Sequence, residues 1–342
     1  MKNGFQRRRA LISKRAYRKV YSKATPITTA IIVLLVAIIV TLSVIIAKDA
    51  IEDKRLNTET APSTDGATSA YEQTTAPKEE FDYSVYDTVS LGASDISKGT
   101  LVLVNRQNGF APLSDSVHIN LYADKDRHYS VASSDIALDQ ETYEALGKLT
   151  TSFFNETGKE ILQITAGFRT KEQQQKYYND MVSSVEDEDY YELPGYSDHH
   201  TGFAFDVKLY LEDGTSLSYG KNAEEHAKWI VDNCHKYGFI MRYPGDKTEH
   251  TGIIAEGNHF RYVGIPHSVY MRENSLCLEE YVSYLKHYSV EEPLEIMTGG
   301  KVYCVYYTQK LSETTQVYVP KDKMYSVSGN NADGFIVTYS VD

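Results

Sequence analysis

Two short segments of the 342-residue chain concentrate side chains that can bind a divalent metal ion. The first contains His199 and Asp206, and the second contains Glu256 and His259. Zinc accepts imidazole nitrogen and carboxylate oxygen, and a hydrolytic zinc site uses three protein ligands and leaves one position open. We therefore predict a single Zn²⁺ held by His199, Asp206 and His259.

Glu256 is the candidate for proton transfer at this site. It lies three residues before His259, so the two side chains would face opposite ways in a regular strand. Gly257 between them could form a β-bulge that brings both to one side. A zinc ion lowers the pKa of bound water to about 7, and a neighbouring carboxylate can take the proton and pass it to a leaving amine. We predict that role for Glu256.

Three arginines are candidates for contacts with a negatively charged group. Arg169 lies in a Gly-Phe-Arg-Thr sequence, between a predicted buried strand and a capped helix. There it could stabilise the oxyanion of a tetrahedral intermediate, although a surface arginine would fit the same position. Arg242 and Arg261 could bind a substrate carboxylate, or they could form salt bridges on the face of a strand.

Neighbouring residues leave alternatives to this ligand set. His200 directly follows His199 and could be the ligand in its place. His267 follows His259 closely, and the chain could turn back toward the site there. Asp198 is expected to form hydrogen bonds or to be solvated rather than to bind metal.

The elements that must position these side chains mix helices and strands without regular βαβ alternation, which favours an α+β fold. Apolar and polar residues alternate over residues 203–210, so that Phe205 faces a core and Asp206 faces the opposite side. Asp139 and Gly158 are predicted to bound a helix. Further predicted elements are strands at 161–165, 239–243, 252–255 and 259–264, a helix at 171–182 and another that ends at Gly238.

The rest of the chain is read from its composition. All 47 Asp and Glu residues but only 26 of the 35 Lys and Arg residues follow residue 26. Nucleic-acid binding needs a basic surface, so no nucleic-acid partner is expected. Residues 289–342 are predicted to form a small β-rich appendage. Cys234, Cys277 and Cys304 are either buried small apolar residues or include a Cys234–Cys277 disulfide.

An uncharged run at residues 27–47 is long enough to span a hydrocarbon core of about 30 Å. Nine Lys or Arg residues precede it in residues 1–26, and basic flanks stay cytoplasmic. We therefore expect a single-pass protein of the cell membrane, in contact with the lipid bilayer through residues 27–47, with a cytoplasmic N-terminus. Residues 48–95 are predicted to be a stalk or linker, and residues 96–288 are predicted to form the extracytoplasmic catalytic domain.

The pattern around the candidate site resembles that of a known family. It consists of Ser197-x-His199-x-x-Gly202-x-Ala204-x-Asp206 and Glu256-x-x-His259. Together with the Gly-Phe-Arg-Thr turn, it is similar to the VanY-like zinc D-alanyl-D-alanine carboxypeptidases and dipeptidases. The resemblance covers roughly residues 100–288. It implies a compact, hedgehog-like zinc D,D-peptidase fold with a small antiparallel sheet.

The resemblance also implies a role for each site residue. Zinc would lie on the three predicted ligands, with Glu256 as catalytic base and Arg169 as transition-state stabiliser. Ser197, with Arg169, would hold the substrate, a peptidoglycan stem peptide that ends in D-Ala-D-Ala and loses its terminal D-Ala. The family usually has Trp where this chain has Asn258, which alters the pocket wall. A wall endopeptidase or L,D-peptidase with the same zinc site, and an inactive wall-binding module, are the alternatives.

Overall fold

The computed structural model describes residues 81–112, 116–123, 127–182, 191–210, 216–217 and 224–341. The chain divides into two units, residues 1–78 and 79–342, and every described residue belongs to the second. The predicted cytoplasmic segment, the predicted membrane span and most of the predicted linker therefore lie outside the described residues. Within the described ranges, no helix combines the length and the apolar character needed to cross a bilayer.

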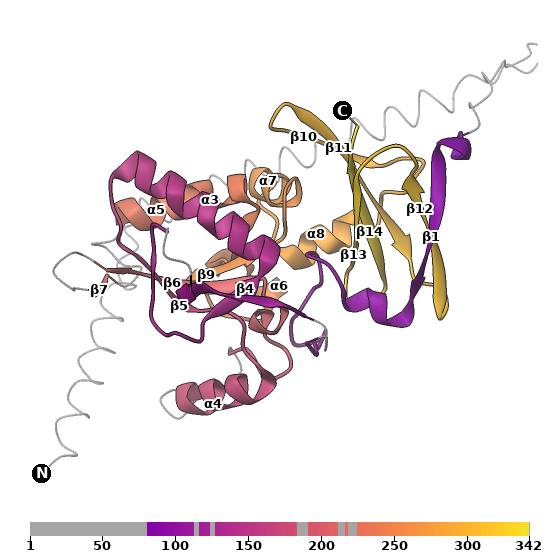
Figure 1. The fold of residues 1–342 in the computed structure, drawn as a ribbon. Coiled ribbons are helices and arrows are strands. Elements are labelled where there is room, and N and C mark those ends of the chain that lie inside the picture. Colours follow the sequence, from indigo (N-terminus) through magenta and orange to yellow (C-terminus); the bar gives the residue numbers. More distant parts are fainter. Residues whose placement is uncertain are drawn as a thin grey trace, which may run out of the picture. The chain divides into compact units, whose positions relative to one another are not determined.

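A six-stranded sheet carries the central part of the described chain (Figure 1). Its strands follow the order β3-β5-β6-β9-β8, and β7 pairs with β6 beside this path. The pair β3 and β5 is parallel and the other pairs are antiparallel. The strands are β3 (Ser130–Val131), β5 (Leu162–Ala166), β6 (Ala204–Tyr210), β7 (Ser216–Leu217), β8 (Phe239–Tyr243) and β9 (Glu256–Tyr262). This mixture of a largely antiparallel sheet with helices confirms the predicted α+β class.

Two helices, α3 (Gln140–Thr157) and α5 (Glu224–Asn233), share a core with this sheet (Figure 1). Helix α3 begins where the Asp139 side chain accepts a hydrogen bond from the Glu141 N–H, and it ends at Gly158 with a left-handed φ of 66°. Both ends agree with the sequence prediction. The shared core includes Leu146, Leu149, Phe153, Phe205, Val207 and Ile230.

Shorter elements surround this sheet. They are β2 (His118–Asn120) paired with β4 (Ala137–Asp139), η3 (Leu121–Ala123), α4 (Lys171–Val182), η5 (Asp198–Thr201), η6 (Cys234–Tyr237), η7 (Gly245–Lys247), α6 (Thr248–Thr251), α7 (His267–Glu273) and α8 (Leu278–Leu285). The strand predicted at 252–255 is absent from this described segment. Gly252 instead caps α6 with a φ of 71°, and the Thr251 hydroxyl accepts a hydrogen bond from the Ile253 N–H.

The C-terminal residues form a second antiparallel sheet of order β10-β11-β14-β13. Its strands are β10 (Leu294–Thr298), β11 (Lys301–Gln309), β13 (Tyr325–Gly329) and β14 (Gly334–Ser340). A separate pair of strands, β1 (Tyr86–Gly92) and β12 (Thr314–Pro320), covers one face of it through a shared apolar cluster. Two 3₁₀ turns, η1 (Tyr83–Val85) and η2 (Ala93–Ser97), flank β1. The predicted β-rich character of this region is confirmed.

Two expectations about this region are wrong. The linker was expected to continue to residue 95, but β1 pairs along its full length with β12, because Val89 and Leu91 can pack into the cluster there. The C-terminal sheet is also no separate appendage. Its Leu294 and Val305 lie in one core with Leu278 of α8 and with Leu101 and Val263 from earlier in the chain. The sheet therefore buries apolar side chains on both of its faces.

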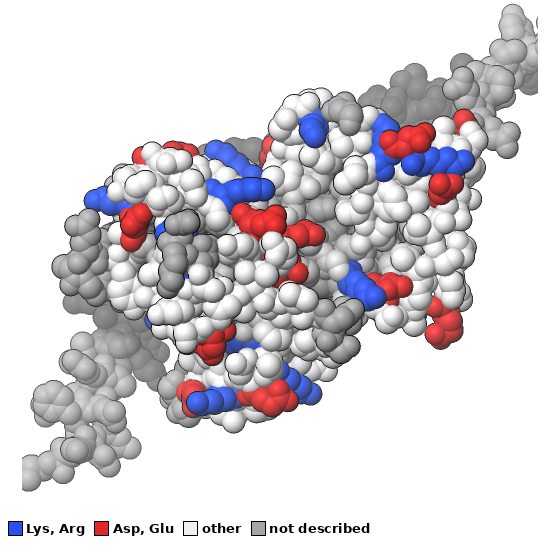
Figure 2. All heavy atoms as spheres, in the orientation of Figure 1, with Lys and Arg blue, Asp and Glu red and all other residues white. Residues whose placement is uncertain are grey.

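Charged side chains are interspersed on the visible surface of the described chain. Figure 2 shows acidic and basic residues in small alternating groups on this face, separated by uncharged surface. The described chain also contains exposed ion pairs, such as Lys286 with Asp333. Such exposed pairs typically contribute about 1 kcal/mol or less to stability, so the packed cores described above hold the fold.

Candidate metal centre

His199 is positioned by a short turn between β5 and β6. The Ser197 hydroxyl caps the 3₁₀ turn η5 by accepting a hydrogen bond from the His199 N–H. The turn ends at Gly202, whose φ is 78° and where a Cβ would lie 2.7 Å from the His118 ring. Only glycine fits there, on both counts. Gly202 therefore lets the chain turn from η5 into β6.

The ring of His199 is oriented so that its Nε2 points toward Asp206. Its Nδ1 lies 2.7 Å from the Gly167 carbonyl oxygen, so Nδ1 carries the proton and donates it. Its Nε2 lies 3.5 Å from Oδ2 of Asp206. A backbone carbonyl that fixes the tautomer of a histidine in this way is a common support of metal ligands.

Asp206 and His259 are direct neighbours across the pair β6 and β9. Because side chains alternate along a strand, the next pair, Phe205 and Phe260, faces the core on the opposite side. The carboxylate Oδ1 of Asp206 lies 2.9 Å from Nδ1 of His259. The alternation predicted for β6 is therefore confirmed, and the register of β9 supplies the second histidine.

These three residues fit a zinc ion. Their ligand atoms all lie within 4.8 Å of one another, and both histidines are buried. Burial alone would lower the pKa of His259, but the hydrogen bond and the charge of Asp206 raise it to about 9. Burial would raise the pKa of Asp206, but His199 and His259 hold it well below its usual value. Two nitrogens and an anionic oxygen around one point are the donors that a catalytic zinc prefers.

Glu256 reaches the same region through an irregularity in β9. Met241 pairs with Phe260 and Tyr243 pairs with Glu256, so three residues of β9 lie opposite one residue of β8. This confirms the predicted bulge. Burial, together with the charges of Glu192 and Asp206, raises the pKa of Glu256 to about 7, although His259 and Arg169 lower it. The carboxyl group is therefore electrostatically coupled to the predicted ligands, and its pKa suits a general base near neutral pH.

Arg169 is nearly buried and lies in the centre, so the alternative of a surface arginine is wrong. Its Nη2 lies 3.1 Å from Oδ2 of Asp206 and 3.0 Å from Nε2 of His199. Its Nη1 donates to Oε1 of Gln174 at 2.8 Å, and its guanidinium stacks 4.3 Å from the Tyr177 ring centroid. These contacts leave it close to where an oxyanion would form beside the predicted metal.

Ser197 has a supporting position in this structure. It is fully buried, and its hydroxyl donates to Oε2 of Glu192 at 2.6 Å while it caps η5. The hydroxyl thus has both a donor and an acceptor partner within the chain. Its contact with a substrate stays a prediction.

Glu192 is a residue that the sequence did not single out. Its carboxylate is buried and accepts hydrogen bonds from Ser197, from the Asp198 N–H at 3.0 Å and from the Tyr243 hydroxyl at 2.6 Å. Burial would raise its pKa, but His259, His199 and these hydrogen bonds lower it to about 2. No motif or spacing marks Glu192, because its partners come from β8 and η5 only once the chain has folded.

The alternative ligands lie elsewhere. Nδ1 of His200 lies 2.7 Å from the Arg169 carbonyl oxygen, and its Nε2 accepts from the Gly195 N–H at 2.9 Å. Both nitrogens bind backbone groups, and His200 brings no ligand atom to the group formed by His199, Asp206 and His259, so it does not replace His199. His267 bonds the hydroxyls of Tyr281 and Thr338, and burial lowers its pKa to about 3. It is a neutral core histidine.

Arg242 and Arg261 form a buried ionic cluster instead of a carboxylate site. Both guanidinium groups are fully buried and bind the buried Asp198. Arg242 also binds Glu279 of α8 at 2.8 Å, and Arg261 donates to the Val102 carbonyl at 2.8 Å. The alternative of salt-bridge partners is therefore confirmed for both, and the cluster connects η5 with β8, β9 and α8.

This cluster gives a stability prediction. Asp198→Asn is expected to lower the free energy of unfolding by about 3–5 kcal/mol, because it leaves buried arginine charge without its counterion. Urea unfolding monitored by circular dichroism would measure the loss. Asp232→Asn is the matched control, since Asp232 pairs with Lys228 and Arg272 near the surface and should cost about 1 kcal/mol or less. Equal losses in the two variants would contradict the interpretation.

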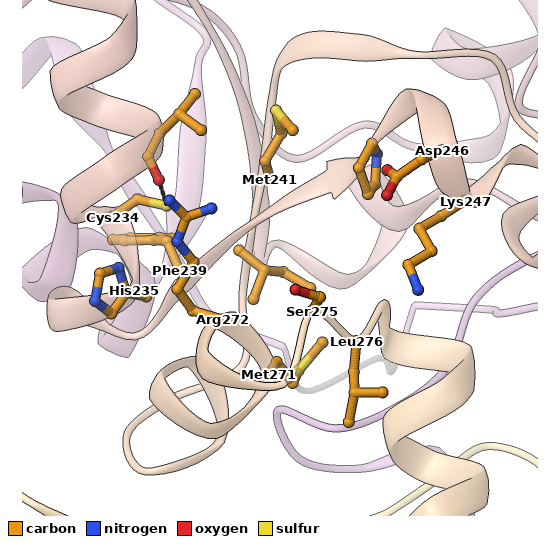
Figure 3. Close-up of a pocket in the computed structure, with 13 residues that line it drawn as sticks. Cys234, His235, Phe239, Met241, Asp246, Lys247, Met271, Arg272, Ser275 and Leu276 are labelled. Carbon is orange, nitrogen blue, oxygen red and sulfur yellow. Dashed lines mark hydrogen bonds between the residues drawn. The ribbon is translucent and has the colours of Figure 1, made fainter. Parts of the chain in front are cut away.

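A separate cavity of about 230 Å³ lies against η6, β8 and α7 (Figure 3). Figure 3 shows Cys234, His235 and Arg272 on one side of it and Asp246 and Lys247 on the other. None of the predicted site residues lines this cavity. Burial raises the pKa of the Cys234 thiol to about 12, which favours the thiol over the thiolate at neutral pH. All three cysteines are free and buried, which excludes the Cys234–Cys277 disulfide in this structure.

Comparisons with known proteins agree with the site. A model of the VanY D-alanyl-D-alanine carboxypeptidase family matches residues 135–265. The D-alanyl-D-alanine carboxypeptidase of Enterococcus faecium is 36% identical over 249 residues, which cover 71% of this chain and 76% of that relative. The bifunctional D-Ala-D-Ala dipeptidase and carboxypeptidase VanXYC of Enterococcus gallinarum is 31% identical, over 54% of this chain and 95% of its own length.

A solved structure extends the likeness to the fold. The D,D-dipeptidase VanXYg, in complex with a D-Ala-D-Ala phosphinate analogue, is 28% identical with a TM-score of 0.64. The match covers 75% of this chain and 99% of that structure.

Proposed function

The chain belongs to the VanY family of D-alanyl-D-alanine carboxypeptidases, and from this premise we propose that it is a membrane-anchored zinc enzyme that removes the terminal D-Ala from peptidoglycan stem peptides. One observation carries the zinc assignment. His199, Asp206 and His259 come from separate elements, and their ligand atoms meet within 4.8 Å of one another, close enough to Glu256 for its charge to raise the pKa of His259.

The residues of the centre divide the chemistry of peptide hydrolysis among them. A bound zinc ion would supply Lewis acidity and lower the pKa of a coordinated water. The Glu256 carboxylate accepts the proton of the attacking water and then delivers it to the leaving amine. The Arg169 guanidinium stabilises the negative charge that develops on the carbonyl oxygen. Burial excludes bulk water and strengthens each of these electrostatic contacts.

The substrate class is supported by the relatives. The curated relatives carry D-Ala-D-Ala in their names, and the structural neighbour binds a D-Ala-D-Ala phosphinate analogue. We therefore assign a D-Ala-D-Ala terminus as the group that this chain recognises. Asn258 lies in the bulge of β9 between Glu256 and His259, so it is placed beside the predicted base and the second predicted histidine ligand.

The location of the enzyme is proposed from its N-terminal sequence. Residues 27–47 would span the cell membrane, with the basic residues 1–26 on the cytoplasmic side. The catalytic residues then lie outside the membrane, where the wall peptide is exposed. Protease added to intact cells should cleave the catalytic part and leave an epitope tag at the N-terminus protected.

The decisive experiment offers the full chain a stem pentapeptide and measures free D-Ala. We expect release of D-Ala that is lost with a chelator and restored by Zn²⁺. Release of a dipeptide or an internal fragment would identify a dipeptidase or endopeptidase. Release of D-Ala from the tetrapeptide alone would identify an L,D-carboxypeptidase. A zinc-loaded protein that cleaves none of these peptides would be a binding module.

The pH dependence of the reaction follows from Glu256. A base must be deprotonated to act, so kcat/KM should rise with pH through the pKa of Glu256, which burial raises to about 7. The charge of a bound divalent ion would lower this pKa. The rise in kcat/KM should therefore lie between the usual pKa of a glutamate and pH 7. Initial rates from pH 4.5 to 8 would measure it. A kcat/KM that is constant over this range would contradict the role of Glu256.

A further inference from the structure

His259 has one ring nitrogen with a partner and one without. Its Nδ1 lies 2.9 Å from Asp206, on the side of the predicted metal. Its Nε2 is buried, and no described atom forms a hydrogen bond with it. If Nδ1 is to bind a metal with its lone pair, the proton must lie on Nε2. A buried N–H in that position needs an acceptor.

Glu192 is the carboxylate best placed to be that acceptor. Glu192, Asp198 and His259 each bring a ligand atom within 4.8 Å of the others. Asp198 is already neutralised, because its two oxygens bind Arg242 and Arg261. Oε1 of Glu192 accepts from the Tyr243 hydroxyl and the Asp198 N–H, but Oε2 accepts only from Ser197. Oε2 therefore keeps a lone pair for a further donor.

The surroundings hold this carboxylate in place. The Tyr243 ring lies 5.0 Å from the His259 ring, and its hydroxyl donates to Glu192. Ser197, which also donates to Glu192, caps the turn that carries His199. The buried Glu192 carboxylate thus contacts Ser197, which caps the turn that carries His199. It also contacts Tyr243, whose ring packs beside His259.

We propose that Glu192 is a positioning residue for the metal centre, which rests on the proposed zinc function. Its carboxylate accepts the proton on Nε2 of His259 through one bridging water, and so fixes the tautomer in which Nδ1 binds the metal. Carboxylate–histidine–metal arrangements orient the ring and increase the basicity of the ligand, and loss of the outer group lowers metal affinity about 10–100-fold.

The test is the zinc affinity of Glu192→Gln, measured by competition with a chromophoric chelator. We expect a loss of about 10–100-fold, and an altered visible absorption spectrum of the Co²⁺-loaded protein, which a general loss of stability would not change. Glu280→Gln is the matched control. Glu280 also accepts hydrogen bonds, from the Cys277 N–H and from Lys247, but lies in α8 and contacts no predicted ligand. An affinity of Glu192→Gln within twofold of wild type overturns the proposal.

A second variant decides the case in which Glu192→Gln does not fold. Tyr243→Phe removes one donor to Glu192 and keeps the carboxylate, so zinc affinity should fall by a few fold with the fold retained. An unchanged affinity in a folded Tyr243→Phe then overturns the proposal. A wild-type chain that binds zinc but cleaves no wall peptide would contradict the proposed function and leave this affinity test decisive. A wild-type chain that binds no zinc overturns both.

Discussion

Glu256→Gln is expected to lower kcat by roughly 10²–10⁴-fold while the zinc content of the protein stays that of the wild type. The amide has the size of the carboxylate but cannot accept the proton of the attacking water. Glu256 is also not one of the three residues whose ligand atoms meet around the predicted ion, so the metal should remain. The measurement is D-Ala release from a stem pentapeptide, together with metal analysis of the same sample.

The control for this variant is Glu249→Gln. Glu249 lies exposed in α6, close in sequence to β9 but away from the centre, and its replacement should leave kcat unchanged. Activity of Glu256→Gln within tenfold of wild type would exclude Glu256 as the base. Loss of zinc from this variant would instead indicate that Glu256 is a ligand.

A chain that ends at residue 288 is expected to lose its cooperative fold altogether. Leu294, Val305 and Ile336 of the C-terminal sheet lie in one core with Leu278 and Leu285 of α8. Their removal would expose the inner side of α8 to water and deprive β1 of its partner strand. Thermal unfolding followed by circular dichroism would show a cooperative transition in the chain that ends at 342 and none in the shortened one.

Two point variants test whether the stability depends on the shared core or only on the length of the chain. Ile336→Ala in the shared core should lower the free energy of unfolding by about 2–5 kcal/mol. Met324→Ala, at a residue that is 93% exposed beside the same sheet, should change it by about 0.5 kcal/mol or less. A shortened chain that unfolds cooperatively and releases D-Ala would show that the C-terminal sheet is dispensable.

The sequence predicted the local parts of this site well. Period-two alternation placed Asp206 opposite the Phe205 core face, and capping residues marked both ends of α3. The spacing of Glu256 and His259 around a glycine predicted the bulge that β9 contains. Each of these features depends on neighbours within a few residues, which sequence patterns record directly.

Contacts between distant segments could not be predicted in the same way. Glu192 has partners on η5 and β8, and Arg242 and Arg261 meet Asp198 only in the folded sheet. A signal was present for the C-terminal sheet. Phe335, Ile336 and Val337 follow one another in β14, and such an apolar run is typical of a strand covered on both faces. A strand covered on both faces indicates that a further layer packs on the C-terminal sheet. In the structure, β1 and β12 form that layer.

The pairing of β1 with β12 has a consequence for how the protein is made. The side chains of Ser90 and Gln316 form a hydrogen bond across this pair, and the two residues lie 226 positions apart in the chain. A ribosome delivers β1 early and its partner almost last, so the edge of β1 waits unpaired while the catalytic residues emerge. Long-range pairings of this kind form slowly and leave nascent chains open to aggregation. The last strands to be synthesised therefore complete the fold, and a chain interrupted late in translation would carry every predicted catalytic residue without a finished fold.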